Sequence, residues 1–72
     1  RLDARLHLED LLRQLAPEER EVLAVRYGIG RPWSMSVAAA ARYLKMTPDR
    51  LYSIEQRALR ILRERNPSPQ AQ

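Results

Sequence analysis

Basic side chains in the second half of the chain are the clearest candidates for chemistry. Residues 37–72 carry seven of them against three acids, whereas residues 1–36 carry six of each, so the whole net charge of +4 lies in the second half. The seven are Arg42, Lys45, Arg50, Arg57, Arg60, Arg63 and Arg65. A one-sided basic surface is typical of proteins that bind a polyanion such as nucleic acid. A solvated helix surface without a partner is the alternative that charge alone leaves open.

The remaining reactive side chains argue against an enzyme or a metal site. The chain has no cysteine and one histidine, His7, so it lacks the residues for a disulfide framework or a zinc site. No nucleophile is patterned with a base, and we expect no catalytic residue, no cofactor and no metal. No apolar run approaches the ~20 residues of a membrane helix, and no signal peptide is found, so we expect no membrane contact. Because the chain opens with Arg1 rather than Met, we expect it to be part of a longer protein.

The elements that would position the basic residues are predicted to be helices joined by short breaks. With 72 residues the chain can form one small domain. We assign residues 1–65 to an all-α domain of about four helices that ends in a helix-turn-helix. Residues 66–72 contain two prolines that cannot continue a helix, and we expect a flexible tail there.

The first half of the chain predicts two helices and a loop. Leucines from Leu2 to Leu15 have the spacing of an amphipathic helix. Pro17 suits the first position of the next helix, although Ala16 before it offers no capping oxygen. Gly28 fits the left-handed residue that ends many helices. We expect Trp33, in the loop that follows, to plug the core.

The second half predicts two helices across a tight turn. Ser34 or Ser36 can cap a helix that runs roughly from Ser36 to Leu44. Thr47-Pro48-Asp49 is a strong start for a helix over Pro48–Arg65. At 100° per residue, the apolar residues of the second helix, including Leu51 and Ile54, fall on one face. Its outward residues in the first turns are Asp49, Arg50, Tyr52, Ser53, Gln56 and Arg57.

One carboxylate, Glu55, falls within the apolar arc of this second helix. Such a group needs a hydrogen-bonding partner, such as an arginine of an earlier helix or a backbone N–H. We interpret it as a carboxylate at the boundary of the core.

These two helices have the residue pattern of a helix-turn-helix. The motif needs a small residue where the helices cross, which Ala41 supplies, and apolar residues around it. The surrounding positions are Ala40, Leu44, Met46, Leu51 and Ile54. Lys45 stands where such turns often hold glycine. In a helix-turn-helix the second helix enters the major groove, where Arg50 could pair with guanine and Arg57 and Arg60 with phosphates. An ordinary helical hairpin is the alternative.

Three segments resemble region 4 of the bacterial sigma-70 factors. They are Leu15-Ala16-Pro17-Glu18-Glu19-Arg20-Glu21-Val22-Leu23, then Arg26-Tyr27-Gly28-Ile29, then Ile54-Glu55-Gln56-Arg57-Ala58-Leu59-Arg60-Ile61-Leu62-Arg63. The resemblance runs without a gap from Leu15 to Arg63. It implies a cytoplasmic bacterial protein that recognises the promoter −35 element through its last helix. It also implies docking on the flap of the RNA polymerase β subunit, and an anti-sigma factor or activator as a further partner.

The resemblance assigns roles to individual residues. Arg26 corresponds to an arginine that contacts the DNA backbone, Asp49 to a carboxylate that accepts from cytosine, and Arg50 to an arginine that contacts DNA. The full DNA-binding set that we expect is Arg26, Ser36, Thr47, Asp49, Arg50, Tyr52, Ser53, Arg57 and Arg60. The polymerase-docking set that we expect is Leu12, Leu15, Val22 and Val25.

Several positions depart from the family pattern. Principal members carry arginine in place of Pro48, Arg-Gln in place of Tyr52-Ser53, and often an arginine in place of Glu18. Each bidentate base contact that is lost would remove roughly 1–3 kcal/mol of discrimination. A second hypothesis therefore stays open: a sigma-4-like module that binds polymerase or a regulator without sequence-specific reading of DNA.

Overall fold

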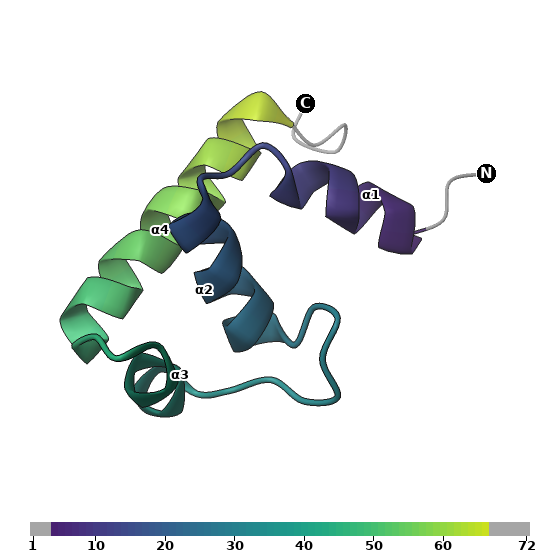
Figure 1. Cartoon of the computed structure of the whole chain (residues 1–72). Helices are drawn as coiled ribbons and strands as arrows, with labels where there is room; N and C mark the ends of the chain where they lie inside the picture. The colour runs from purple at the N-terminus through teal and green to yellow at the C-terminus, as the bar shows by residue number, and fades with distance from the viewer. Residues whose placement is uncertain (1–3, 67–72) are drawn as a thin grey trace.

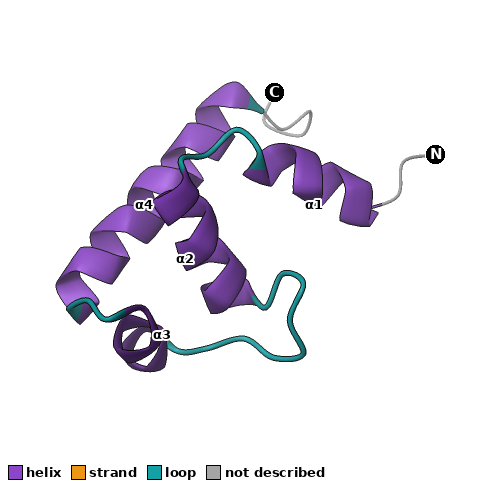
Figure 2. Ribbon diagram, viewed as in Figure 1, coloured by secondary structure: helices purple, strands orange, loops and turns teal. Residues whose placement is uncertain are grey.

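A computed structural model describes residues 4–66 (Figure 1). The helices are α1 (Ala4–Leu12), α2 (Pro17–Tyr27), α3 (Val37–Leu44) and α4 (Pro48–Arg65). The described part of the chain contains no strand, which confirms the all-α prediction (Figure 2). The tail predicted over residues 66–72 lies outside this description, except for Asn66, as does Leu2 of the first predicted helix.

Local sequence signals set the ends of the helices as expected. Ser36 and Thr47 cap α3 and α4, since their hydroxyl oxygens accept from the backbone N–H groups of Ala39 and Arg50 at 3.2 and 3.1 Å. At the start of α2 the Glu19 carboxylate accepts from the Ala16 N–H at 3.0 Å, which compensates for the missing capping oxygen of Ala16.

Two residues take the left-handed conformation where a helix ends. Gly28 ends α2 with a φ of 70°. A Cβ atom at Gly28 would lie 3.0 Å from the Trp33 carbonyl oxygen, so glycine is required there by space as well as by φ. Lys45 ends α3 with a φ of 60° and forms the turn to α4, in the position where the motif often holds glycine.

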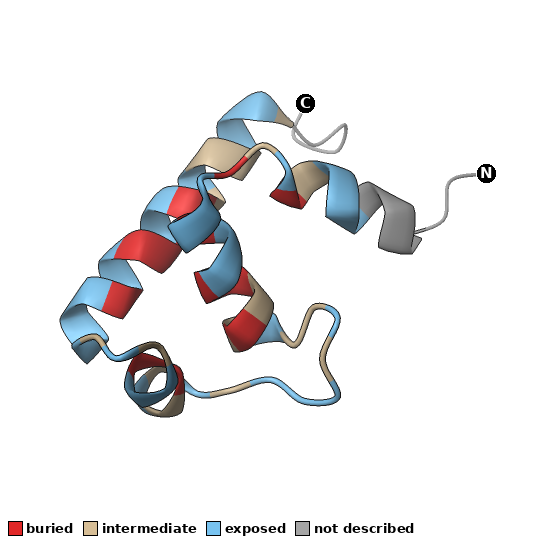
Figure 3. Ribbon diagram, viewed as in Figure 1, coloured by how far each residue is buried: buried red, intermediate tan, exposed pale blue. Residues whose placement is uncertain are grey.

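The core lies where α2, α3 and α4 meet (Figure 3). Its buried members are Val22, Val25, Ala40, Ala41, Leu51 and Ile54. Ala40 and Ala41 are almost fully buried, and their small side chains allow α3 to approach its neighbours closely. The helix-turn-helix prediction for α3 and α4 is therefore consistent with the packing.

A second apolar cluster attaches α1 to the C-terminal half of α4. Leu12, Leu15, Leu23 and Ala58 are its buried members. The first helix is shorter than predicted, because α1 ends at Leu12 and Leu15 lies in the connection to α2. Asn66, after α4, exchanges side-chain hydrogen bonds with Gln14 in the same connection, at 3.1 and 3.4 Å.

Two sequence predictions about burial are wrong. Trp33 is 62% exposed and does not plug the core. Backbone groups hold the loop instead, because the Met35 N–H donates to the Val25 carbonyl at 3.1 Å. Glu55 is 3% exposed, so it is a buried residue rather than a boundary one. Its predicted type of partner, an arginine of an earlier helix, is confirmed as Arg26.

Candidate nucleic-acid interface

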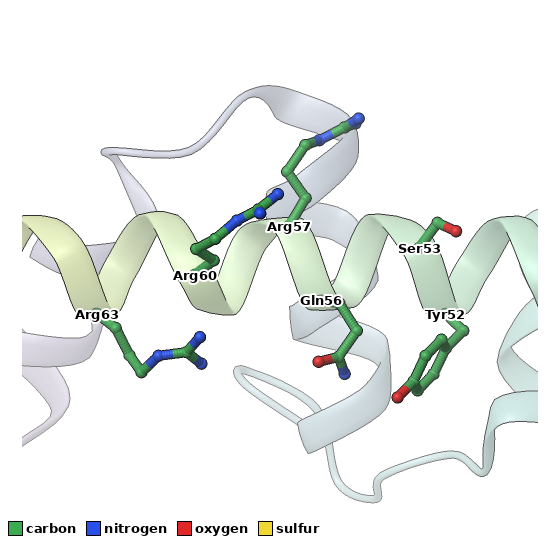
Figure 4. Close-up of a pocket in the computed structure, with 6 residues that line it drawn as sticks. All are labelled: Tyr52, Ser53, Gln56, Arg57, Arg60 and Arg63. Atoms are coloured by element: carbon green, nitrogen blue, oxygen red, sulfur yellow. The ribbon is translucent and has the colours of Figure 1, made fainter.

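The exposed side of α4 presents a basic surface with polar and aromatic side chains between the arginines (Figure 4). Its residues line a shallow hollow of about 470 Å³. They are Tyr52, Ser53, Gln56, Arg57, Arg60 and Arg63. Ser53, Arg57 and Arg60 extend toward one edge of the helix, and Tyr52, Gln56 and Arg63 toward the other. Guanidinium groups, an amide and hydroxyls at this spacing can hydrogen-bond to phosphates and to base edges.

The N-termini of α3 and α4 add donors beside this surface. The Ser36 and Thr47 side chains are exposed, and each oxygen already accepts a capping hydrogen bond. Their hydroxyl protons can still be donated to a phosphate oxygen. The positive end of each helix favours an anion, although Asp49 in the first turn of α4 opposes this at α4.

Two arginines of α4 are paired with carboxylates at the start of α2. Arg50 Nη2 lies 2.8 Å from Glu18 Oε2, and both side chains are substantially exposed. Arg57 Nε lies 2.9 Å from Glu19 Oε2, and the Glu19 side chain is only 9% exposed. Arg50 and Arg57, two of the predicted DNA-contacting arginines, thus already have partners within the protein. The sequence did not predict these pairs, because the partners lie 32 and 38 residues apart.

Arg26 belongs to a partly buried network behind the interface. Its Nε donates to Glu55 Oε1 at 2.8 Å, its Nη2 to Glu55 Oε2 at 3.4 Å, and its Nη1 to the Met35 carbonyl at 2.8 Å. The guanidinium also lies 5.2 Å from the centre of the Tyr27 ring. Arg26 therefore joins α2, α4 and the loop before α3. The role that the resemblance gave it, a contact to the DNA backbone, stays a prediction.

Tyr27 completes this network from the end of α2. Its hydroxyl donates to Glu55 Oε2 at 2.5 Å. The hydrogen bond to the Glu55 carboxylate, followed by burial, raises the pKa of Tyr27 above its ordinary value of 10.0. The phenol is held protonated because ionising it would place a second negative charge beside Glu55.

The residues predicted to dock on polymerase lie mainly in the core. Leu15, Val22 and Val25 are 4%, 0% and 0% exposed, so they are not a surface on which a partner can dock. Apolar core and apolar docking residues have the same signature in one sequence, and this is why the prediction failed. Leu12 is the exception, because it borders an apolar groove.

This groove runs between α1 and α4 and has a volume of about 400 Å³. We call it the α1–α4 groove. It is lined by Leu8, Leu11, Leu12, Leu23, Tyr27, Ile29, Leu59 and Leu62. Helical steps of about 100° put Leu59 and Leu62 on a different side of α4 from Arg57 and Arg60. The same steps put Arg63 only about 40° from Leu59, so the groove and the basic surface are neighbouring surfaces of one helix that meet between these two residues.

The basic surface brings together part of the predicted DNA-binding set. It contains Tyr52, Ser53, Arg57 and Arg60, while Ser36, Thr47, Asp49 and Arg50 are exposed near the starts of α3 and α4. The predicted set omitted Gln56 and Arg63, which the same helical periodicity places beside it. Among the side chains that the structure describes, those of residues 8–66, no cluster of His, Asp or Glu could hold a metal ion. No helix within residues 4–66 is long and apolar enough to cross a membrane.

The fold and this surface define a helix-turn-helix domain whose second helix, α4, is basic on its exposed side. The chain is 32% identical to the RNA polymerase sigma factor SigA2 of Synechococcus elongatus over 62 residues, which are 86% of this chain and 19% of that factor. It is 37% identical to SigA of Microcystis aeruginosa and of Synechocystis sp. over 59 residues, which are 82% of this chain and 14% of each factor. The chain belongs to the sigma-70 family, in the part called region 4.

These similarities cover most of this chain but only a small part of each relative. The chain spans less than a fifth of the length of these relatives. No family model matches the chain. No solved structure matches it either.

Proposed function

We propose that this chain is the region 4 domain of a bacterial sigma factor acting in transcription initiation in the cytoplasm. In this proposal the exposed side of α4 binds promoter DNA of the −35 type, and the α1–α4 groove docks on the β flap of RNA polymerase. An anti-sigma factor or an activator would be a further partner. The observation that carries the proposal is the row of Arg57, Arg60 and Arg63 on the exposed side of a recognition helix whose other side is core.

The DNA-binding part is supported by the chemistry of the surface. Arginines supply phosphate contacts, whose number sets affinity and its salt dependence. Gln56, Ser53 and Tyr52 lie between them and can reach base edges, with Gln suited to adenine. The mixture of phosphate-binding and base-reading side chains fits DNA better than it fits a featureless polyanion.

The docking part is supported by the α1–α4 groove. Leu8 is 41% exposed at its rim, and Leu11, Ile29, Leu59 and Leu62 are half-buried along it. A groove lined by leucines accepts the apolar face of a partner helix. Since Arg57 and Arg60 lie on a different side of α4 from Leu59 and Leu62, a partner in the groove would leave these two arginines accessible to DNA.

A protein-interaction module without base reading is the second candidate. Its support is that Arg50 and Arg57 are both paired with carboxylates of α2, and that Pro48 and Tyr52 replace the family's arginines. In this case the groove would still bind its partner, whereas the basic surface would bind any duplex weakly or not at all.

The experiment that separates the two candidates is an NMR titration of the labelled chain with a −35-type duplex and a scrambled duplex at two salt concentrations. Base reading predicts shifts over Asp49–Arg57 that are stronger for the −35-type duplex. Arg60→Ala should weaken binding to both duplexes and lower the slope of log affinity against log salt concentration by about one. Arg13→Ala, which lies outside the basic surface, should do neither. Equal shifts that salt removes would refute base reading.

Docking is tested separately with the purified β flap domain by isothermal titration calorimetry. Leu8→Asp should abolish flap binding while leaving the DNA titration unchanged, because Leu8 lies at an exposed rim of the groove. If Leu8→Asp binds the flap as well as the unmodified chain does, the groove is not the docking site. Val25 is unsuitable for this test, because charging a fully buried residue would unfold the domain.

A further inference from the structure

We propose that Glu18 sets the DNA affinity of this chain by competing with DNA for Arg50. The inference rests on the proposed function in one respect, namely that the exposed side of α4 faces DNA. It does not require that the domain prefer any particular sequence.

The pair has the geometry of a competitor. Arg50 lies in the first turn of α4, where its backbone is fixed by the N–H bond to the Thr47 cap. Its guanidinium reaches Glu18 at the start of α2, with Nη2 2.8 Å from Oε2. The two side chains are 59% and 44% exposed, so the pair can open without disturbing the core. An exposed pair of this kind is weak and reversible.

The neighbouring pair of Arg57 with Glu19 behaves differently. The Glu19 side chain is 9% exposed, and its other carboxylate oxygen accepts from the Ala16 N–H at the start of α2. Glu19 is therefore held by the fold and keeps its position when a ligand arrives. Of the two carboxylates, Glu18 is the one that regulates access to an arginine rather than capping a helix.

Glu18 opposes DNA binding in two ways. Arg50 must leave the carboxylate before it can contact a phosphate or a guanine, and the carboxylate then remains beside the polyanion. Glu18→Gln keeps the side chain's shape, weakens its hold on Arg50 to a hydrogen bond without charge assistance, and removes the charge beside the polyanion. We expect this variant to bind duplex DNA about two- to fivefold more tightly at low salt, and the gain to shrink as salt screens the charges.

The test is fluorescence anisotropy with labelled −35-type and scrambled duplexes at several salt concentrations, on the 72-residue chain. Four variants are compared with the unmodified chain: Glu18→Gln, Arg50→Ala, the double variant, and Asp10→Asn. Asp10→Asn is the matched control, because it removes the same charge from an exposed pair on α1, 3.8 Å from Arg13. Circular dichroism of each variant verifies the fold.

The expected result is a gain for Glu18→Gln that exceeds the Asp10→Asn effect and largely disappears when Arg50 is alanine. A gain that persists in full in the Arg50→Ala background overturns the competition, since removal of a repelling charge alone would then explain all of it. No gain over Asp10→Asn also overturns it. A gain of equal size on both duplexes supports the role of Glu18 while refuting sequence reading. Absence of binding by every variant refutes both proposals.

Discussion

Replacing Glu55 by glutamine should destabilise the protein by about 2–4 kcal/mol. This is a large share of the roughly 4–11 kcal/mol expected for a domain of this size. The Glu55 carboxylate is buried, accepts from Arg26 at 2.8 and 3.4 Å, and accepts from the Tyr27 hydroxyl at 2.5 Å. The amide of the variant keeps the shape but turns N–H donors toward the N–H donors of Arg26.

The magnitude follows from how far each partner is buried. Removing one member of a fully buried pair costs about 3–5 kcal/mol, because the other charge is left uncompensated. Arg26 keeps 22% side-chain exposure, and its bond to the Met35 carbonyl at 2.8 Å survives the change. Water and this carbonyl therefore compensate part of the loss, and we expect about 2–4 kcal/mol rather than the range for a fully buried pair.

Urea denaturation followed by circular dichroism measures the change. Glu21→Gln is the matched control, because Glu21 also pairs with an arginine, Arg31, at 3.1 Å, but with side chains 48% and 30% exposed. The control should lose at most about 1 kcal/mol. Equal losses in the two variants, or a loss below about 1 kcal/mol for Glu55→Gln, would refute the argument that burial gives the Glu55 pair its importance.

Three further predictions concern stability. Tyr27→Phe should remove a pH dependence of the free energy of unfolding. Folded Tyr27 keeps its proton to higher pH than the unfolded phenol, so its stabilisation is complete below about pH 10 and is lost above it. In alkaline denaturation curves, only the unmodified chain should show this loss. Lys45→Gly should raise the free energy of unfolding by about 0.5–1 kcal/mol in urea denaturation, because Lys45 has a φ of 60°, and no gain would contradict the strain. Gly28→Ala should lower the melting temperature by an amount equivalent to about 1–3 kcal/mol, because its Cβ would lie 3.0 Å from the Trp33 carbonyl oxygen at a φ of 70°; an unchanged melting temperature would contradict it.

Local chemistry explains why the helix ends were predictable from sequence. Thr47-Pro48 and Gly28 act on backbone groups within four residues, so their effect is visible without knowing the fold. The small residues Ala40 and Ala41 were also predictable, because two helices across a short turn must cross at a fixed place.

Residues whose role depends on distant elements were not predictable in the same way. Trp33 has the large apolar side chain that is typical of a core residue. A backbone hydrogen bond between Met35 and Val25 nevertheless holds the loop, and the indole is exposed. Val25 has an apolar side chain that would suit a docking surface, yet it lies in the core. A single sequence gives the side chain but not the face that it occupies.

The contacts of Glu55 show that some residues of the family resemblance have a structural role, which is distinct from a role in binding DNA. The two most specific segments, Arg26-Tyr27-Gly28-Ile29 and the one that opens with Ile54-Glu55, meet in space, because Arg26 and Tyr27 both bond to Glu55. Their residues are therefore required by the packing of α2 on α4. The departures at Glu18, Pro48 and Tyr52 lie instead at exposed positions. The resemblance at the first set of residues predicts the fold, whereas in the proposed function DNA preference depends on the second set, where substitutions should change binding without changing stability.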